Sequence, residues 1–289
     1  MTKKIAIVGI FFDGYYDIWE DFLELISIHW PDCPYDIYIV DNEMDLEFNK
    51  KYKVQVIHAG KDAEYSTKVR TAVQNIDADY YLFLLEDFFF ERKVKTYQLD
   101  DLVSLMAKNG IEYLRMPMFD FSGKGDSVKH LSTLDSESSF HFIPSTSEYT
   151  ISCQPSLWGK NFLKACIGEG NYNAWIFEGI YTYSKFAHTN EFLSKCRIDF
   201  NNILGLRHGA VQGKMLPSVC KAFVQQGYSF KNKRGQLSGL KYIMYSIRQK
   251  MGEYMPLSFL RFVRRRLGKS VVEKYRREIE YYMKINNIE

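Results

Sequence analysis

The sequence predicts an α/β protein in which a mostly parallel β-sheet is flanked by helices. Short apolar runs alternate with stretches of helical spacing between residues 5 and 118, in the order β-α-β-β-α-β-α-β. Of the 289 residues, 46% are hydrophobic and 25% are charged, which is the composition of a globular protein with room for one large domain and an appendage. This order of elements is typical of sheets that bind nucleotides.

Each expected element has its own local pattern. Apolar runs that favour strands occupy residues 5–11, 36–40, 54–58, 80–90 and 111–118, and ordered structure is expected to resume over residues 151–158. Apolar residues recur at helical spacing in residues 17–29, 66–76, 99–108, 161–167 and 172–186, and again from residue 237 onward. Residues 119–149 are rich in Ser, Gly and Asp and show little periodicity, which indicates a long substrate loop.

Several classes of protein are excluded by missing patterns. Only Gly9 and Gly14 occur near the first strand, so the sequence lacks the GxGxxG turn of a dinucleotide site, and it contains no P-loop. The five cysteines are scattered singly, so we expect reduced thiols and no structural zinc. The N-terminus leads directly into the first strand, and no window approaches about 18 uninterrupted apolar residues. We therefore expect a cytoplasmic chain without a signal peptide or membrane span.

The charge distribution divides the chain into residues 1–236, the expected α/β domain, and residues 237–289, a basic helical tail. From residue 241 to the end there are 12 Lys and Arg against five Glu. Residues 258–267 interleave Phe, Val and Leu with four arginines, which is typical of a helix lying on an anionic membrane surface. The alternative is a helix packed on the α/β domain with its arginines in solvent.

Two adjacent carboxylates, Glu86 and Asp87, interrupt the most apolar run of the chain. Burying an unpaired carboxylate costs several kcal/mol, so these side chains must face a cation or solvent at the carboxyl edge of the sheet. That edge is where open α/β sheets bind ligands. Oxygen ligands suit Mg²⁺ or Mn²⁺ held together with a diphosphate. The alternative is a solvated acidic turn.

A second candidate lies in residues 207–214. Arg207, His208 and Lys214 place an imidazole and two cations among glycines, which suits contact with a diphosphate. Glycine also allows the backbone to approach a ligand closely. A surface turn with incidental charges is the alternative.

A third candidate is Glu178, which follows Trp175 by three residues. A carboxylate among aromatic rings can have a raised pKa and act as a general base toward a sugar hydroxyl. The indoles of Trp158 and Trp175, together with Gln154, are the expected acceptor contacts. A surface helix with Trp175 in the core is the alternative, and Asp120 or Glu148 would then be the base.

These motifs, taken in order, resemble those of GT-A glycosyltransferases from bacterial capsule, O-antigen and cell-wall polysaccharide clusters. The resemblance covers roughly residues 5–217, through the segments 19–22, 30–34, 85–88, 152–158, 175–178 and 208–214. It implies that Glu86 and Asp87 hold the donor and a metal, with His208 as a further metal ligand, that Glu178 is the base, and that His208 and Lys214 bind the diphosphate. The usual Asp-x-Asp is Leu85-Glu86-Asp87 here. Metal dependence is therefore open, and Arg207 or Lys214 could stabilise the leaving diphosphate instead.

The resemblance further implies inverting transfer of a sugar from a nucleotide sugar, by default a UDP-sugar, to a lipid-linked or oligosaccharide acceptor at the inner face of the membrane. Two alternatives stay open. One is a nucleic-acid-binding protein that uses the basic tail, although this leaves Glu86, Asp87 and His208 without a role. The other is a nucleotidyltransferase, which also pairs carboxylates with a metal and a nucleotide.

Overall fold

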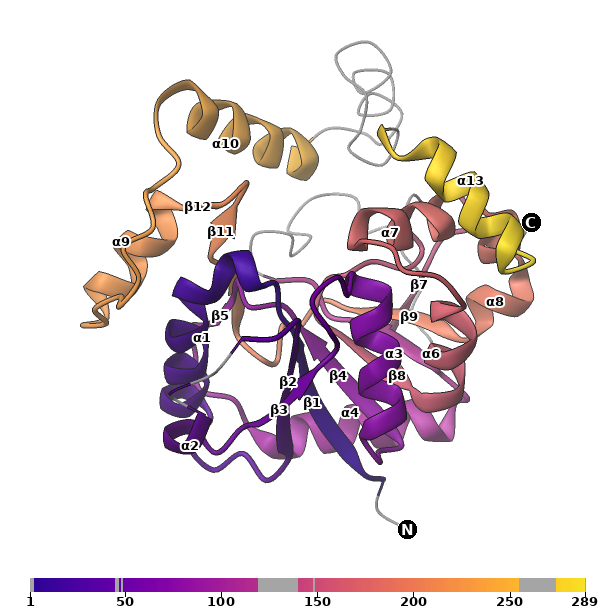
Figure 1. The fold of residues 1–289 in the computed structure, drawn as a ribbon, viewed down its shortest axis with the longest axis horizontal. Coiled ribbons are helices and arrows are strands. Elements are labelled where there is room, and N and C mark those ends of the chain that lie inside the picture. The colour runs from indigo at the N-terminus through magenta and orange to yellow at the C-terminus, as the bar shows by residue number, and fades with distance from the viewer. Residues whose placement is uncertain are drawn as a thin grey trace.

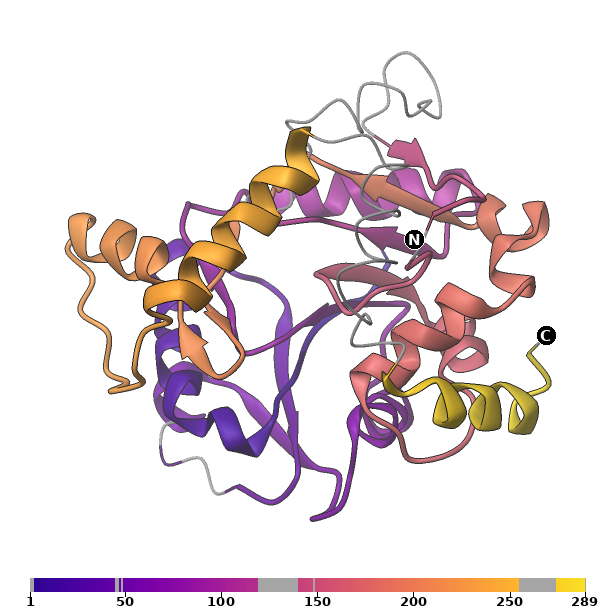
Figure 2. The same cartoon turned by 90° about the horizontal axis from the view of Figure 1, so that it is seen from above.

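The structure is a computed structural model and describes residues 3–44, 47, 49–118, 140–147, 149–254 and 274–288. Its centre is an eight-stranded sheet with the strand order β3-β2-β1-β4-β8-β6-β9-β7, with helices on both faces (Figures 1 and 2). The strands are β1 Ile5–Ile10, β2 Asp36–Asp41, β3 Gln55–His58, β4 Tyr80–Leu84, β6 Tyr113–Arg115, β7 Phe140–Phe142, β8 Ser156–Gly159 and β9 Cys196–Asp199. The helices that cover them are α1 Tyr16–His29, α2 Asn49–Tyr52, α3 Tyr65–Asn75, α4 Thr96–Lys108, α6 Lys160–Ile167, α7 Ala174–Tyr183 and α8 Asn190–Ser194.

The predicted α/β class with a mostly parallel sheet is confirmed. Strands β3, β2, β1 and β4 run parallel to one another, as do β6 and β9, whereas β8 is antiparallel to both of its neighbours and β7 to β9. Four of the seven pairings are therefore parallel. The carboxyl ends of β1, β2 and β4 meet at one edge, where open sheets of this kind bind ligands.

The apolar sequence of β1 follows from burial on both faces of the sheet. All six of its residues are buried. Ile5 and Ile7 pack in a cluster with α1 and α4, whereas Ala6, Val8 and Ile10 pack in a second cluster with α3, α6 and α7. A strand covered on both sides needs apolar residues at every position, which is why the run shows no alternation.

The single strand predicted over residues 80–90 is in fact two strands. Strand β4 ends at Leu84, and β5 (Phe88–Phe90) pairs with β10 (Leu206–His208) in a separate two-stranded sheet. The break is a turn in which the Phe88 N–H donates to the Leu85 carbonyl oxygen at 3.1 Å. Since both strands are fully buried, their apolar pattern could not reveal the turn. The turn carries Glu86 and Asp87.

The two helices described within residues 237–289 lie at different places on the protein. Helix α10 (Gly239–Tyr254) lies over the top edge of the molecule in Figure 1, but α13 (Arg276–Ile285) returns to pack along α7. Ile279 of α13 is fully buried, and the rings of Tyr282 and Tyr172 lie 4.7 Å apart. Helix α13 therefore packs on the α/β domain through α7. Residues 258–267 lie outside the described residues, so their membrane contact stays a prediction. Within the described part of the chain, no helix combines the length and apolar character needed to cross a bilayer.

Candidate active site

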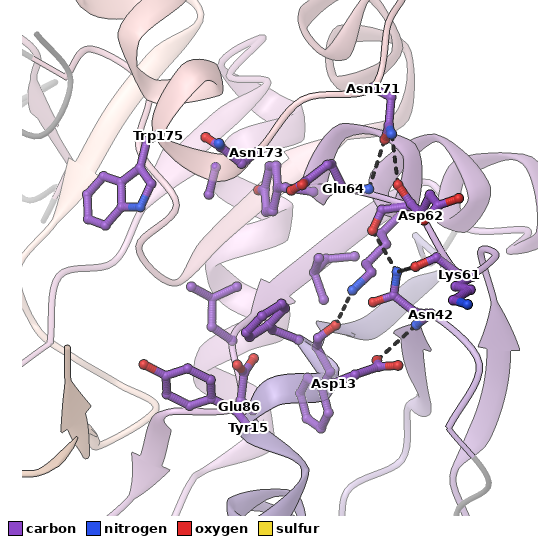
Figure 3. A pocket seen from close by; sticks show the side chains of 18 of the residues that line it. Asp13, Tyr15, Asn42, Lys61, Asp62, Glu64, Glu86, Asn171, Asn173 and Trp175 are labelled. Carbon is purple, nitrogen blue, oxygen red and sulfur yellow. Dashed lines mark hydrogen bonds between the residues drawn. The ribbon is translucent and has the colours of Figure 1, made fainter. Parts of the chain in front are cut away.

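A cavity of about 920 Å³ opens at the carboxyl ends of β1, β2 and β4. Its walls come from residues 10–15 after β1, Asn42 after β2, residues 61–68 at the start of α3, residues 85–87 after β4, and residues 171–175 at the start of α7. Figure 3 shows Trp175 and Asn173 on one side of the cavity and Glu86, Tyr15 and Asp13 on the opposite side. Ligand space is thus present at the edge that the parallel strands predict.

Two polar residues that the sequence analysis missed close the β1–β2 side of the cavity. Asp13, in the short helix η1 (Asp13–Tyr15), accepts a hydrogen bond from the Asn42 N–H at 3.1 Å. The Asn42 amide donates to the carbonyl oxygens of Gly60, Lys61 and Ala63 at 3.0, 2.9 and 2.8 Å. Both residues follow directly after apolar strands. The same reasoning that singled out Glu86 at its strand end could have found them.

A buried lysine, Lys68, lines the cavity. The side chain of Lys68 on α3 is 3% exposed, and its Nζ donates to the Phe11 carbonyl oxygen at 2.6 Å. Burial lowers the pKa of Lys68, while the charges of Asp13 and Glu86 oppose this shift. The Lys68 ammonium is a cation inside the cavity wall. In the sequence, Lys68 follows Ser66 and Thr67 on a helix, and this local pattern does not reveal that the lysine is buried at a cavity.

Glu86 is buried at 6% exposure in the wall of the cavity. Burial, with a further contribution from the charge of Asp87, raises the pKa of Glu86 to about 8. A carboxyl group with this pKa is mostly protonated at neutral pH while the cavity holds no cation. The alternative of a solvated acidic turn is therefore wrong for Glu86.

Replacing Glu86 with Gln is expected to stabilise the ligand-free protein, and to do so more strongly as the pH rises. A carboxyl group whose pKa is raised on folding favours the folded state at low pH and loses that contribution as the pH rises toward 8. We expect Glu86→Gln to add about 1 to 3 kcal/mol to the free energy of unfolding at pH 8 and much less at pH 5. Urea unfolding at both pH values measures this. Glu191→Gln, at an exposed position of α8, is the control and should change little. An equal effect of Glu86→Gln at both pH values would contradict the raised pKa.

The structure brings Asp87 and His208 together across β5 and β10. His208 Nε2 lies 2.9 Å from Asp87 Oδ2, and the Gly209 N–H donates to the Asp87 carbonyl oxygen at 2.6 Å. Among the described residues, the buried Oδ1 of Asp87 has no hydrogen-bond partner. A buried oxygen without a hydrogen-bond partner destabilises the folded protein unless a ligand or cation binds to it. Since His208 Nε2 is engaged by Asp87, His208 is placed to orient the carboxylate rather than to bind a metal through that nitrogen.

The other two cations of the 207–214 segment lie outside the cavity wall. Arg207 Nε donates to Glu91 Oε2 at 2.8 Å, in an ion pair next to the contact between His208 and Asp87. Lys214 is exposed on β12 (Lys214–Met215), which pairs with β11 (Ala210–Val211). The structure therefore separates Arg207 and Lys214 from Asp87 and His208, and their contact with a diphosphate stays a prediction.

The glycines of this segment serve packing and turn geometry rather than close approach to a ligand. A side chain at Gly209 would begin 2.4 Å from the Phe89 ring, so the close packing of β5 requires glycine there. Gln212 and Gly213 have φ angles of 50° and 75°, and a two-residue hairpin turn with positive φ at both positions favours glycine. The surface-turn alternative is thus right for residues 212–213.

The predicted acceptor residues are divided by the structure. Trp175 is 45% exposed and lines the cavity, as predicted for a stacking surface. Trp158 is 2% exposed, packs on Tyr113, and donates from Nε1 to Ser156 Oγ at 2.9 Å, so the prediction that it offers a stacking face is wrong. Gln154 is partly buried and is not part of the cavity wall. An isolated sequence segment could not distinguish the core indole from the exposed one.

Glu178 lies one helical turn beyond the cavity-lining start of α7. Its Oε1 accepts a hydrogen bond from the Cys153 N–H at 2.8 Å. Burial raises the pKa of Glu178 to about 7, which suits a general base near neutral pH. Glu178 is not itself among the cavity-lining residues, so its catalytic role stays a prediction. The two other candidate bases, Asp120 and Glu148, lie outside the described residues.

Arg234 is a further residue that the sequence analysis missed. It forms an ion pair with Asp17 of α1, donates to the carbonyl oxygens of Gly14 and Gly213 at 2.9 and 3.2 Å, and lies 4.2 Å over the ring of Tyr15. Tyr15 lines the cavity, so Arg234 ties the cavity rim to the β11–β12 turn. The basic run of residues 231–234 was the available signal.

The cavity wall carries an excess of negative charge. The carboxylates of Asp13, Asp62, Glu64 and Asp87 line it, together with the mostly protonated Glu86, against the ammonium groups of Lys61 and Lys68. A diphosphate would be repelled by this wall unless a cation bound with it. Among the described residues, no three His, Cys, Asp or Glu side chains come together as a complete metal site. Any divalent cation here would need ligand oxygens to complete its coordination.

No protein-family model matches the chain, and no curated protein matches it. Similar solved structures include S. aureus TarS 1–349 in complex with UDP, which is 13% identical over 68% of this chain and 58% of that chain with a TM-score of 0.45. Mannosyl-3-phosphoglycerate synthase from Rubrobacter xylanophilus is 12% identical over 88% of this chain and 77% of that chain, with a TM-score of 0.43. Glucosyl-3-phosphoglycerate synthase from Mycobacterium tuberculosis in complex with phosphoglyceric acid is 10% identical over 78% and 80%, with a TM-score of 0.43. The chain spans 35% of the longer TarS structure. At this level of similarity, the matches assign no activity to the chain.

Proposed function

We propose that this protein is a glycosyltransferase of the GT-A type that transfers a sugar from a nucleotide-sugar donor, by default a UDP-sugar, to a surface-polysaccharide acceptor. The observation that carries the proposal is the cavity at the carboxyl edge of the parallel strands. There Asp87, whose buried Oδ1 has no partner among the described residues, lines the same cavity as an exposed indole, Trp175. A carboxylate able to hold a cation and a flat ring able to stack on a sugar are the two groups that such a transfer needs.

The donor is assigned to the side of the cavity formed by β1, β2 and β4. Asp13 and Asn42 offer hydrogen-bonding groups at the strand ends, and Tyr15 adds a ring beside Glu86. The diphosphate then lies toward Asp87. His208 holds the Asp87 carboxylate from its other side at 2.9 Å, which fixes its orientation before the donor arrives.

A divalent cation fits this site as part of the donor complex. Asp87 Oδ1 is a buried oxygen without a partner among the described residues, and even with Glu86 protonated the wall has more carboxylates than lysines. Asp87 would hold Mg²⁺ or Mn²⁺, with the donor diphosphate supplying further oxygens. When bound, the cation neutralises charge on the leaving diphosphate. Lys68 supplies a second, fixed positive charge in the wall.

The reaction proposed is a single inverting displacement. Glu178 takes the proton of an acceptor hydroxyl, the hydroxyl oxygen forms a bond to the anomeric carbon, and the bond from that carbon to the diphosphate oxygen breaks. The nucleoside diphosphate leaves with the bonding electron pair. The acceptor is assigned to the Trp175 side, opposite Glu86 and Tyr15 (Figure 3). We infer a lipid-linked or oligosaccharide acceptor, met at the cytoplasmic face of an anionic membrane.

A nucleotide panel tests the proposal. Isothermal titration of the full chain with UDP, GDP, CMP and a DNA duplex, each with and without Mn²⁺, should show binding of one nucleoside diphosphate that strengthens with the metal. Incubation with the matching nucleotide sugars should then release that nucleotide in the presence of acceptor. Binding of the duplex alone would support a nucleic-acid-binding protein, and pyrophosphate release from a nucleoside triphosphate would support a nucleotidyltransferase. Either result would replace the proposal.

Replacing Trp175 with Ala is expected to weaken acceptor use while leaving donor binding intact. Loss of a stacking ring costs about 1 to 2 kcal/mol, which corresponds to a rise of about five- to thirtyfold in the acceptor KM. Steady-state kinetics with varied acceptor measure this. Phe186→Ala is the matched control, because Phe186 is 46% exposed against 45% for Trp175 but lies outside the cavity. A loss of UDP affinity in Trp175→Ala would move the ring to the donor side.

A further inference from the structure

Helix α10 exposes a stripe of aliphatic side chains. Leu240, Ile243, Met244 and Ile247 are 76%, 52%, 46% and 46% exposed. Positions separated by three, four and seven residues lie on one face of a helix, so these four side chains form a continuous apolar strip. Single exposed aliphatic residues are common on protein surfaces, but a whole helical face of them is typical of a binding surface.

The opposite side of α10 is the one that packs on the protein. Tyr242 and Tyr245 are partly buried and contact the core cluster that contains α1 and α9 (Pro217–Gln225). The helix therefore turns two tyrosines inward and four aliphatic residues outward, the reverse of an ordinary surface helix. Folding of the described chain does not explain the aliphatic face, because it leaves that face in solvent.

The charge around this stripe selects the kind of partner. Residues 212–254 contain eight Lys and Arg and only one acidic residue, Glu253. Lys221, Lys233 and Lys241 are exposed on α9, on the segment after it and on α10 itself. An aliphatic helical face within a basic region is the pattern of a helix that lies in the interface of an anionic bilayer. A nucleic acid would use the lysines but not the stripe, and a second copy of the chain would bring together two surfaces of like charge.

We propose that α10 is an interfacial membrane helix whose Leu240, Ile243, Met244 and Ile247 side chains enter the headgroup boundary of an anionic bilayer. The placement of the helix accords with the chemistry of the site. Figure 1 shows α10 above the edge of the sheet toward which β1 and β4 run, and the cavity opens at that edge. Contact through α10 therefore brings the cavity near the lipid surface, where a lipid-linked acceptor would lie. This last consequence rests on the proposed glycosyltransferase function, but the lipid contact itself does not.

Vesicle binding by the full chain tests the proposal. We expect the wild-type chain to co-sediment with vesicles of phosphatidylglycerol and phosphatidylcholine, and to bind pure phosphatidylcholine vesicles much more weakly. The double variant Leu240→Ser/Ile243→Ser should bind the anionic vesicles at least tenfold more weakly, because both side chains lose their apolar contact with lipid. Ile28→Ser is the matched control: Ile28 on α1 is 52% exposed, as Ile243 is, and should leave vesicle binding unchanged.

Two results would overturn the proposal. One is equal vesicle binding by the wild type and the double variant, which would leave lipid contact to other parts of the chain. The other is a wild-type dimer in sedimentation velocity that the double variant abolishes, which would assign the stripe to a second copy. UDP titration of the same proteins separates this proposal from the proposed function. Vesicle binding lost with UDP binding retained supports the lipid role of α10, whereas a wild type that binds vesicles but no nucleotide would remove only the proposed transferase.

Discussion

Asp87→Asn is expected to lower sugar transfer by about 10³-fold or more and to abolish the strengthening of UDP binding by Mn²⁺. The amide keeps an oxygen that can contact His208, as Asp87 Oδ2 does at 2.9 Å. The unpartnered Oδ1 is then replaced by an NH₂ group or, with the amide turned over, by an uncharged oxygen. Removing one charged group that stabilises a leaving group typically lowers turnover by about 10²- to 10³-fold, and loss of the cation lowers turnover further. Turnover with the donor from the nucleotide panel, and UDP titrations with and without Mn²⁺, measure both effects.

The neighbouring ion pair supplies a close control. Glu91, directly after β5, accepts from Arg207 at 2.8 Å, so Glu91→Gln weakens this ion pair without touching the cavity. This variant should unfold more easily, by about 1 to 3 kcal/mol, yet keep its turnover. If Asp87→Asn keeps wild-type turnover and metal response, Asp87 is not in the donor site. If Glu91→Gln loses as much activity as Asp87→Asn, the loss of activity results from a weakened pairing of β5 with β10 and not from the loss of a carboxylate in the cavity.

Glu178→Gln is expected to lower turnover by about 10² to 10⁴, the range for loss of a general base, with UDP affinity unchanged. The pH dependence carries the stronger test. Since burial raises the pKa of Glu178 to about 7, the base is protonated and inactive at low pH. Wild-type turnover should therefore rise as the pH increases through about 7. The variant should lose this rise, because Gln does not titrate.

Glu191→Gln is the control for this pair of measurements, since its carboxylate is exposed and lies at the start of another helix, α8. It should keep both the turnover and the pH profile of the wild type. Near wild-type turnover in Glu178→Gln would assign the base to another carboxylate, with Asp120 and Glu148 the next to replace. Loss of UDP binding together with turnover would place Glu178 on the donor side of the cavity.

The sequence by itself determined the α/β class and the ligand edge of the sheet. Apolar runs such as residues 5–10 indicated the strands of the sheet, because a strand covered on both faces must be apolar throughout. A pair of carboxylates at the end of such a run can only lie where a cation or solvent reaches it, so Glu86 and Asp87 were predicted at the cavity. Asp13 and Asn42 also follow apolar strands and line the cavity, but the sequence analysis did not single them out.

The tertiary structure alone decided which side chains meet. His208 reaches Asp87 because β10 pairs with β5 across 121 positions of sequence, whereas Arg207, one residue earlier on the same strand, meets Glu91 instead. Trp158 and Trp175 both stand in apolar segments of the sequence. Trp158 is nevertheless buried in the sheet, whereas Trp175 lines the cavity. Local patterns report burial and backbone conformation, since these depend on near neighbours. Pairing across the fold depends on register and on the direction of each side chain, and no local pattern encodes either.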